Sequence, residues 1–155
     1  MNRERDIVQP SSDPNIDFLI LADRAEAVNG KLYVMGGAWE TTFARNTDEP
    51  VAISFAVGLS VPWNATNHDY DIEIHIEDPE GQDVFHLSAH FNQGRPPSVR
   101  PGDPQRAILA APALSVRFPR FGAYYAVARI TGGQHEAVKV VAFRVEALQV
   151  LQHVS

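Results

Sequence analysis

The stretch VAISFAVGLSV, Val51 to Val61, decides the fold class of this chain. Large apolar side chains occupy every second position, at Ile53, Phe55, Val57, Leu59 and Val61. Successive side chains of a β-strand point to opposite faces, so this period predicts a long strand with one face buried in a core.

The opposite face of the same strand carries only small side chains, at Ala52, Ser54, Ala56, Gly58 and Ser60. A strand face that meets water normally carries long or charged side chains. We therefore expect another surface to cover this face. It is either another segment of this chain or a second copy in a homo-oligomer, because two-fold interfaces commonly cover such patches.

Two further alternating segments, Tyr70–Glu77 and Val84–Phe91, flank the turn sequence DPEGQD and predict a hairpin. If the hairpin folds symmetrically about PEGQ, four cross-strand pairs follow. They are Asp78 with Asp83, His75 with His86, Glu73 with Ser88, and Asp71 with His90.

The polar face of this hairpin allows two interpretations. Two imidazoles beside carboxylates offer ligands that a zinc-like ion accepts. Their spacing matches no recognised metal motif, and polar residues on an outer strand face usually contact water. We predict a solvated His75–His86 pair with no metal and no cofactor. A metal- or small-ligand-binding sensor that uses this pair is the alternative function.

The rest of the chain also reads as strands. Residues 18–26 and 31–43 flank Asn29-Gly30, which suits a tight hairpin turn, and residues 106–118, 123–131 and 137–150 follow later. Pro112 predicts an edge position or a bulge. About eight strands predict an all-β, antiparallel two-sheet β-sandwich, immunoglobulin-like or jelly-roll-like, with a closed barrel as the second choice. We expect a flexible arm at 1–16 and one domain at 17–155.

Gly36 and Gly37 stand between apolar runs, where glycines either cradle a phosphate or bend a strand. A phosphate cradle needs a helix N-terminus after the glycines, and no helical period follows Gly37. Alternation resumes at Trp39, Thr41 and Phe43 instead. The pair therefore predicts a bend where another group approaches closely.

Composition excludes several functions. The formal net charge of -6 argues against general nucleic-acid or anionic-membrane binding. The absence of cysteine removes disulfides, thiolate metal sites and a cysteine nucleophile. The charged start MNRERDIVQPSSDPN is neither a signal peptide nor a membrane anchor, so we expect a cytoplasmic protein. No serine or carboxylate pair has a catalytic context, so we do not expect an enzyme.

Four segments in order carry a family resemblance: LADRAEAVNGKLYVMGGAWE, VPWNATNHDYDIEIHIEDPEGQDV, GRPPSVRPGDPQRA and FPRFGAYYAVARI. Between Leu21 and Val145 the chain resembles a group of small, uncharacterised actinobacterial proteins that share a domain of unknown function. The resemblance implies a β-sandwich and assigns no catalytic residue.

Strand counting gathers two unusual loops, Pro62–His68 and Asn92–Gln105, at one end of the molecule. Trp63 is an anchor of the kind enriched in interaction hot spots. The candidate binding residues are Trp63, Asn67, His68, Arg95 and Arg100. The sequence thus favours a non-catalytic binding or assembly module whose partner is another protein or a second copy of this chain. The alternative for these loops is scaffolding, with Trp63 capping the core.

Overall fold

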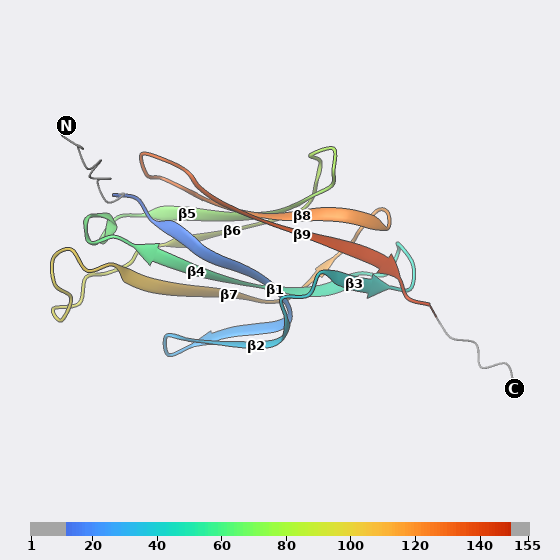
Figure 1. Ribbon diagram of the computed structural model, residues 1–155, viewed down its shortest axis with the longest axis horizontal. Coiled ribbons are helices and arrows are strands. Elements are labelled where there is room, and N and C mark those ends of the chain that lie inside the picture. Colours follow the sequence, from blue (N-terminus) through green and yellow to red (C-terminus); the bar gives the residue numbers. More distant parts are fainter. Residues whose placement is uncertain (1–11, 150–155) are drawn as a thin grey trace, which may run out of the picture.

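The computed structural model describes residues 12–149 (Figure 1). The described strands are β1 (Asn15–Val28), β2 (Lys31–Gly37), β3 (Thr41–Ala44), β4 (Val51–Val61), β5 (Tyr70–Glu77), β6 (Asp83–Phe91), β7 (Gln105–Val116), β8 (Gly122–Thr131) and β9 (Ala137–Ala147). The expectation of an all-β chain is confirmed, with one strand more than the eight expected. The only helical segment within residues 12–149 is the single 3-10 turn Trp63–Ala65. None of the described helical structure is long and apolar enough to span a membrane.

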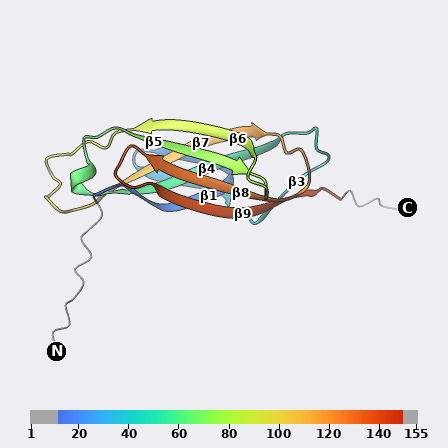
Figure 2. The same cartoon turned by 90° about the horizontal axis from the view of Figure 1, so that it is seen from above.

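The strands form two sheets. One has four strands in the order β2-β1-β4-β7, and the other has five in the order β3-β9-β8-β5-β6. The sheets lie one over the other in Figure 1, and the view from above shows strands of both running along the long axis of the molecule (Figure 2). Strands β6 and β7 are edge strands of their sheets, as are β2 and β3.

The hydrophobic core takes residues from both sheets. Seven side chains predicted to be in the core are at most 5% exposed: Ile53, Phe55, Val57 and Leu59 on β4, and Ile72, Ile74 and Ile76 on β5. The period-two prediction for these strands is confirmed, although β4 and β5 belong to different sheets. Phe55 stacks on Phe85 of β6 with ring centroids 5.9 Å apart. Phe85 and Leu87 are only half-buried because β6 is an edge strand.

Strand β1 has two successive partners because the chain leaves the plane of the sheet halfway along it. Residues 15–22 pair with β4, and residues 22–28 pair with β2 around the expected turn at Asn29-Gly30. The segment beyond Ala22 folds back under its own sheet (Figure 1), where Ala25 and its neighbours meet Pro112 of β7 across a shallow hollow. We call residues 23–37 the flap.

The flap explains the small residues on the outward face of β4. Ala56 is fully buried and packs with Ala22 and Ala25 in a second, small hydrophobic cluster. Farther along the same face, a Cβ at Gly58 would overlap the ring of Phe18, which lies across it. This part of the face is therefore covered within one chain, as the first of the two alternatives expected.

The glycine pair after β2 bends the chain, as expected, and also sends it into the other sheet. Gly36 has a φ of 58° and Ala38 a φ of 61°, both in the left-handed region. A Cβ at Gly36 would overlap the carboxylate of Asp23, so the group that approaches closely is a side chain. The single strand expected over 31–43 is thus two strands. Strand β3 pairs with β9 in parallel, which corrects the expectation of a wholly antiparallel fold.

Pro112 was expected at an edge position or at a bulge, and it lies at both. It lies on the edge strand β7, where a missing N–H costs least. The register of β4 against β7 also shifts between Ile53 and Phe55, opposite Pro112, so two residues of β7 face one residue of β4. The irregularity is a β-bulge at the proline.

The N-terminal boundary needs a correction. Residues 1–11 of the predicted flexible arm lie outside the described residues, as does Val150 at the expected end of the last strand. The rest of the arm is docked: Asp13 is 7% exposed, and its carboxylate accepts hydrogen bonds from the backbone N–H groups of Gln134 at 3.1 Å and His135 at 2.9 Å. Strand β1 then begins at Asn15 rather than after residue 17. The arm was expected because the start of the chain is charged and then rich in Pro, Ser and Asp, and such a composition does not reveal a partner more than a hundred residues away.

Candidate functional site

Four connections between strands lie at one end of the molecule, on the left in Figure 1, which we call the loop end. They are the turn at Asn29-Gly30 and residues 62–69, 92–104 and 132–136. The prediction that the two unusual loops share one end is confirmed, because antiparallel strands joined in succession alternate in direction. The Asn29-Gly30 turn reaches this end only because the flap folds back.

Arg95 and Trp63 form the centre of the loop end. The Arg95 guanidinium lies over the Trp63 ring, 3.5 Å from the ring centroid. Its Nε donates to the hydroxyl of Thr66 at 2.8 Å, and a terminal nitrogen donates to the Trp63 carbonyl at 3.0 Å. The stack and both hydrogen bonds fix the long loop against the 3-10 turn. Arg95 therefore fixes the conformation of this surface and also gives it a positive charge.

The other three candidate residues lie in the same two loops as this pair. Asn67 is exposed, with a φ of 61°, and its backbone N–H donates to the carbonyl of Gln93 at 2.8 Å. His68 is exposed and borders a polar hollow of about 480 Å³ whose wall includes Asp13. Arg100 is exposed in the proline-rich stretch of the long loop. The five residues share one end, but only Trp63 and Arg95 form a direct pair.

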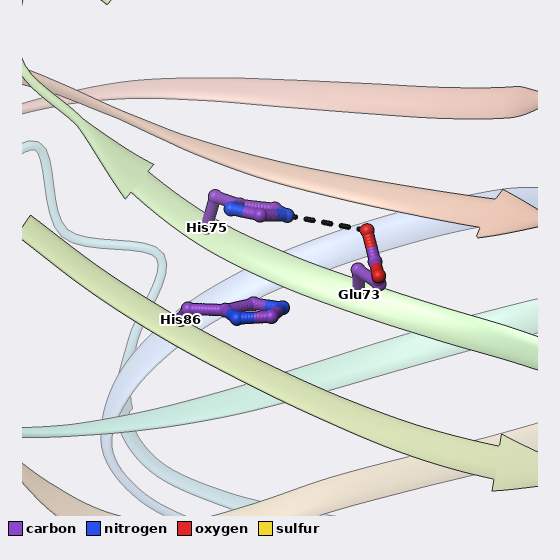
Figure 3. A group of neighbouring side chains, drawn as sticks. All are labelled: Glu73, His75 and His86. Carbon is purple, nitrogen blue, oxygen red and sulfur yellow. Dashed lines mark hydrogen bonds and ion pairs between the residues drawn. The ribbon is translucent and has the colours of Figure 1, made fainter. Parts of the chain in front are cut away.

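The second candidate site is the outer face of the β5–β6 hairpin. Three of the four predicted cross-strand pairs are confirmed: His75 with His86, Glu73 with Ser88, and Asp71 with His90. The rings of His75 and His86 stack with centroids 4.4 Å apart and an interplanar angle of 12° (Figure 3).

The fourth pair is wrong because the ladder shifts by one residue near the turn. Asp83 pairs with Glu77, whereas Asp78 is buried and accepts hydrogen bonds from the N–H groups of Glu80 and Gln82. Asp83 is thereby free to reach His75. The sequence analysis missed this contact because a symmetric hairpin places Asp83 beyond the reach of the imidazole.

His75 is held between two carboxylates. Its Nδ1 lies 2.9 Å from Asp83 Oδ2, and its Nε2 lies 3.3 Å from Glu73 Oε2 (Figure 3). Partial burial alone lowers the pKa of His75, but the hydrogen bonds and charges of Asp83 and Glu73 outweigh it, and the net pKa lies above its ordinary value. Ligand atoms of Glu73, His75 and His86 all lie within 4.8 Å of one another.

A third feature was not visible in the sequence. An apolar cavity of about 130 Å³ lies between the edge strands β6 and β7, and Phe55, Leu87 and Leu109 are among the residues that line it. Periodicity identifies which residues face inward, but not which strands lie at an edge and leave the core partly open.

Comparison with known proteins gives a family and no activity. The model of a family of unknown function, DUF6941, matches residues 17–145, and the chain belongs to this family. No curated protein matches the chain by sequence. Among solved structures it is similar to the "putative beta-galactosidase" of Bacteroides fragilis, with 19% identity and a TM-score of 0.44 over 64% of this chain. The aligned part is 14% of that protein, and a likeness at this level indicates neither fold nor activity for this chain.

Proposed function

We propose that this protein is a non-catalytic binding or assembly module that recognises a protein partner through the loop end. The observation that carries the proposal is the contact between Arg95 and Trp63. Tryptophan and arginine dominate interaction hot spots, and here the stack on the Trp63 ring and two hydrogen bonds already hold the Arg95 side chain in one arrangement. Little conformational entropy remains to be lost on binding, which favours affinity.

The partner that fits this surface has exposed carboxylates. Arg95 and Arg100 place two positive charges on the long loop of a chain whose net charge is -6. An acidic surface would thus be attracted to the loop end and repelled by most of the remaining protein, which would orient the encounter. The partner is a different protein or a second copy of this chain. We also propose that the protein comes from an actinobacterium and is located in the cytoplasm. We infer that the two facing sheets form an immunoglobulin-like or jelly-roll-like sandwich.

The test is partner capture from host extract by the full chain and by Arg100→Glu. Arg100 is the better position because Arg95 also holds the loop in place, so its replacement would disturb the surface as well as its charge. Arg45→Glu is the matched control: it makes the same charge change on an exposed residue in the β3–β4 connection, at the opposite end of the molecule. We expect one saturable partner that is lost in Arg100→Glu and kept in Arg45→Glu. Equal capture by both variants would remove the loop end from consideration.

A further inference from the structure

The outer face of the five-stranded sheet holds a group of side chains whose nitrogen and oxygen atoms converge. Glu73 and His75 lie two residues apart on β5 and therefore on the same face, and the ladder places His86 beside His75. Figure 3 shows both imidazole rings lying parallel, with the Glu73 carboxylate at the tip of the His75 ring. All three side chains come from one hairpin.

Hydrogen-bond chemistry makes the contact between His75 and Glu73 informative. A neutral imidazole has one N–H donor and one acceptor nitrogen. If His75 donates from Nδ1 to Asp83, its Nε2 carries a lone pair that faces a Glu73 oxygen at 3.3 Å. Two acceptors at that distance repel each other unless a cation, either a proton or a metal ion, is shared between them. The arrangement is therefore complete only when it holds a cation.

We propose that Glu73, His75 and His86 form a binding site for one divalent transition-metal ion of the zinc class. This site does not depend on partner binding at the loop end. Ligand atoms in a tetrahedral zinc shell lie about 3.4 Å apart, as follows from zinc–nitrogen and zinc–oxygen bonds of about 2.0–2.2 Å. The contact between Glu73 and His75 already has this length at 3.3 Å. His86 is exposed, so its side chain has room to rotate toward the other two.

The type of ligand selects the class of metal. Two imidazole nitrogens with one carboxylate suit zinc, copper or nickel, whereas calcium and magnesium prefer oxygen ligands alone. Three protein ligands leave a further position for water or for an external ligand. The site is thus built to bind a metal ion that can in turn bind another molecule.

Asp83 has the role of a positioning residue. Histidines that bind metals almost always donate their second ring nitrogen to a carboxylate or carbonyl, which fixes the tautomer and the ring orientation. Asp83 Oδ2 lies 2.9 Å from Nδ1 of His75, on the side of the ring away from Glu73. On β8 the residue opposite His75 is Val127, which is buried, and the residue opposite Glu73 is Arg129, which is partly exposed and whose Nε lies 3.5 Å from Glu136. The neighbouring strand therefore places an apolar side chain beside His75, and beside Glu73 a guanidinium that already has Glu136 as a partner.

The experiment is calorimetric titration of untagged, chelator-treated protein with zinc chloride and, separately, with calcium chloride. We expect one zinc site per chain and no calcium binding. His86→Gln and Glu73→Gln should abolish or strongly weaken zinc binding, and Asp83→Asn should weaken it by about 10–100-fold, the usual effect of losing an outer carboxylate. Both His86 and Asp83 are exposed, so their replacement leaves the folded chain available for measurement.

His90→Gln is the matched control, because His90 lies on the same face of β6 as His86 and also contacts carboxylates, those of Asp69 and Asp71. It should bind zinc like the unchanged chain. Substitution by Co²⁺ adds an independent measurement, since the visible spectrum of a tetrahedral cobalt site should be present in His90→Gln and absent in His86→Gln. The proposal is overturned if zinc does not bind at millimolar concentration, if calcium binds equally well, or if His90→Gln weakens zinc binding as much as His86→Gln.

Discussion

The outward faces of the two sheets carry side chains of opposite size. On β4 the outward residues are small, and Ala56 is fully buried beneath the flap. On β5 the outward residues are Asp71, which is exposed, and Glu73, His75 and Glu77, which are partly exposed. The size of the side chains on an outward strand face thus indicates what lies against it: another segment of the same chain in one case, solvent or an ion in the other. Four measurements test this comparison, beginning with the largest expected effect.

The largest effect on stability is expected for the loss of a side chain on the inward face of β4. Phe55→Ala should lower the free energy of unfolding by about 3–5 kcal/mol, because a buried aromatic ring is replaced by a cavity. Phe55 is fully buried and stacks on Phe85. Urea unfolding monitored by circular dichroism measures the change. A loss below about 1 kcal/mol, the range of ordinary surface substitutions, would show that the register of β4 is wrong.

A larger side chain on the outward face of β4, which the flap covers, should destabilise the protein. Ala56→Leu should destabilise the chain by about 1–3 kcal/mol, because extra methyl groups would have to displace the flap. Ser88→Leu is the matched substitution on an exposed outward position of β6, and its effect should stay within about 0.5 kcal/mol. If the two variants unfold at the same urea concentration, the flap does not lie on β4 in solution and the comparison fails.

The backbone at the end of the flap can be tested separately. Gly36→Ala should cost about 1–2 kcal/mol, the price of a left-handed φ in a residue with a side chain. Gly36 has a φ of 58°, and the new methyl group would also meet Asp23. Gly94→Ala is the control, since Gly94 has open space around its Cα and no positive φ. Thermal unfolding of the two variants should separate them, and equal midpoints would contradict the bend described here.

The smallest effect concerns the solvated end of the β5–β6 face. The hydrogen bond from His90 Nδ1 to Asp71, at 2.8 Å, is the main cause that raises the pKa of His90 above its ordinary value, and Asp69 adds to it. Protonated His90 therefore stabilises the folded state. This contribution is complete below the pKa that His90 has in the unfolded chain, and it is lost as the pH rises through the higher pKa that His90 has in the folded chain. NMR titration should show the raised pKa in the unchanged chain and a lower one in Asp71→Asn. An unchanged His90 pKa in that variant would mean that the contact is absent in solution.

The sequence was most informative where a pattern has one structural meaning. Alternation identified β4 and β5 and their inward residues, because the two faces of a strand differ in burial. The turn after β5 placed His75 beside His86, since register follows from turn length. Both results depend on interactions between residues that are close in the chain.

Contacts between distant segments could not be predicted in the same way. The glycines at 36 and 37 indicated a bend, but their pattern does not predict which sheet the chain enters after the bend. Strand counting placed Arg95 and Trp63 at one end, whereas their stacking depends on side-chain conformations that no period encodes. Asp83 was placed opposite the wrong residue, and its contact with His75 was missed because a bulge changes which side chain it can reach.

The parallel pairing of β3 also has a consequence for the order in which the protein assembles during synthesis. Strand β3 has one neighbour in its sheet, and that neighbour is β9, the last strand described. Hydrogen bonds from Arg144 to Glu40 at 2.9 Å and from Leu148 to Ala44 at 2.8 Å extend the pairing at both ends. On the ribosome, β3 emerges early and must wait without a partner until most of the chain has been made. During that interval both edges of its backbone are open to strands of other nascent chains, and the arrival of β9 covers one of the two.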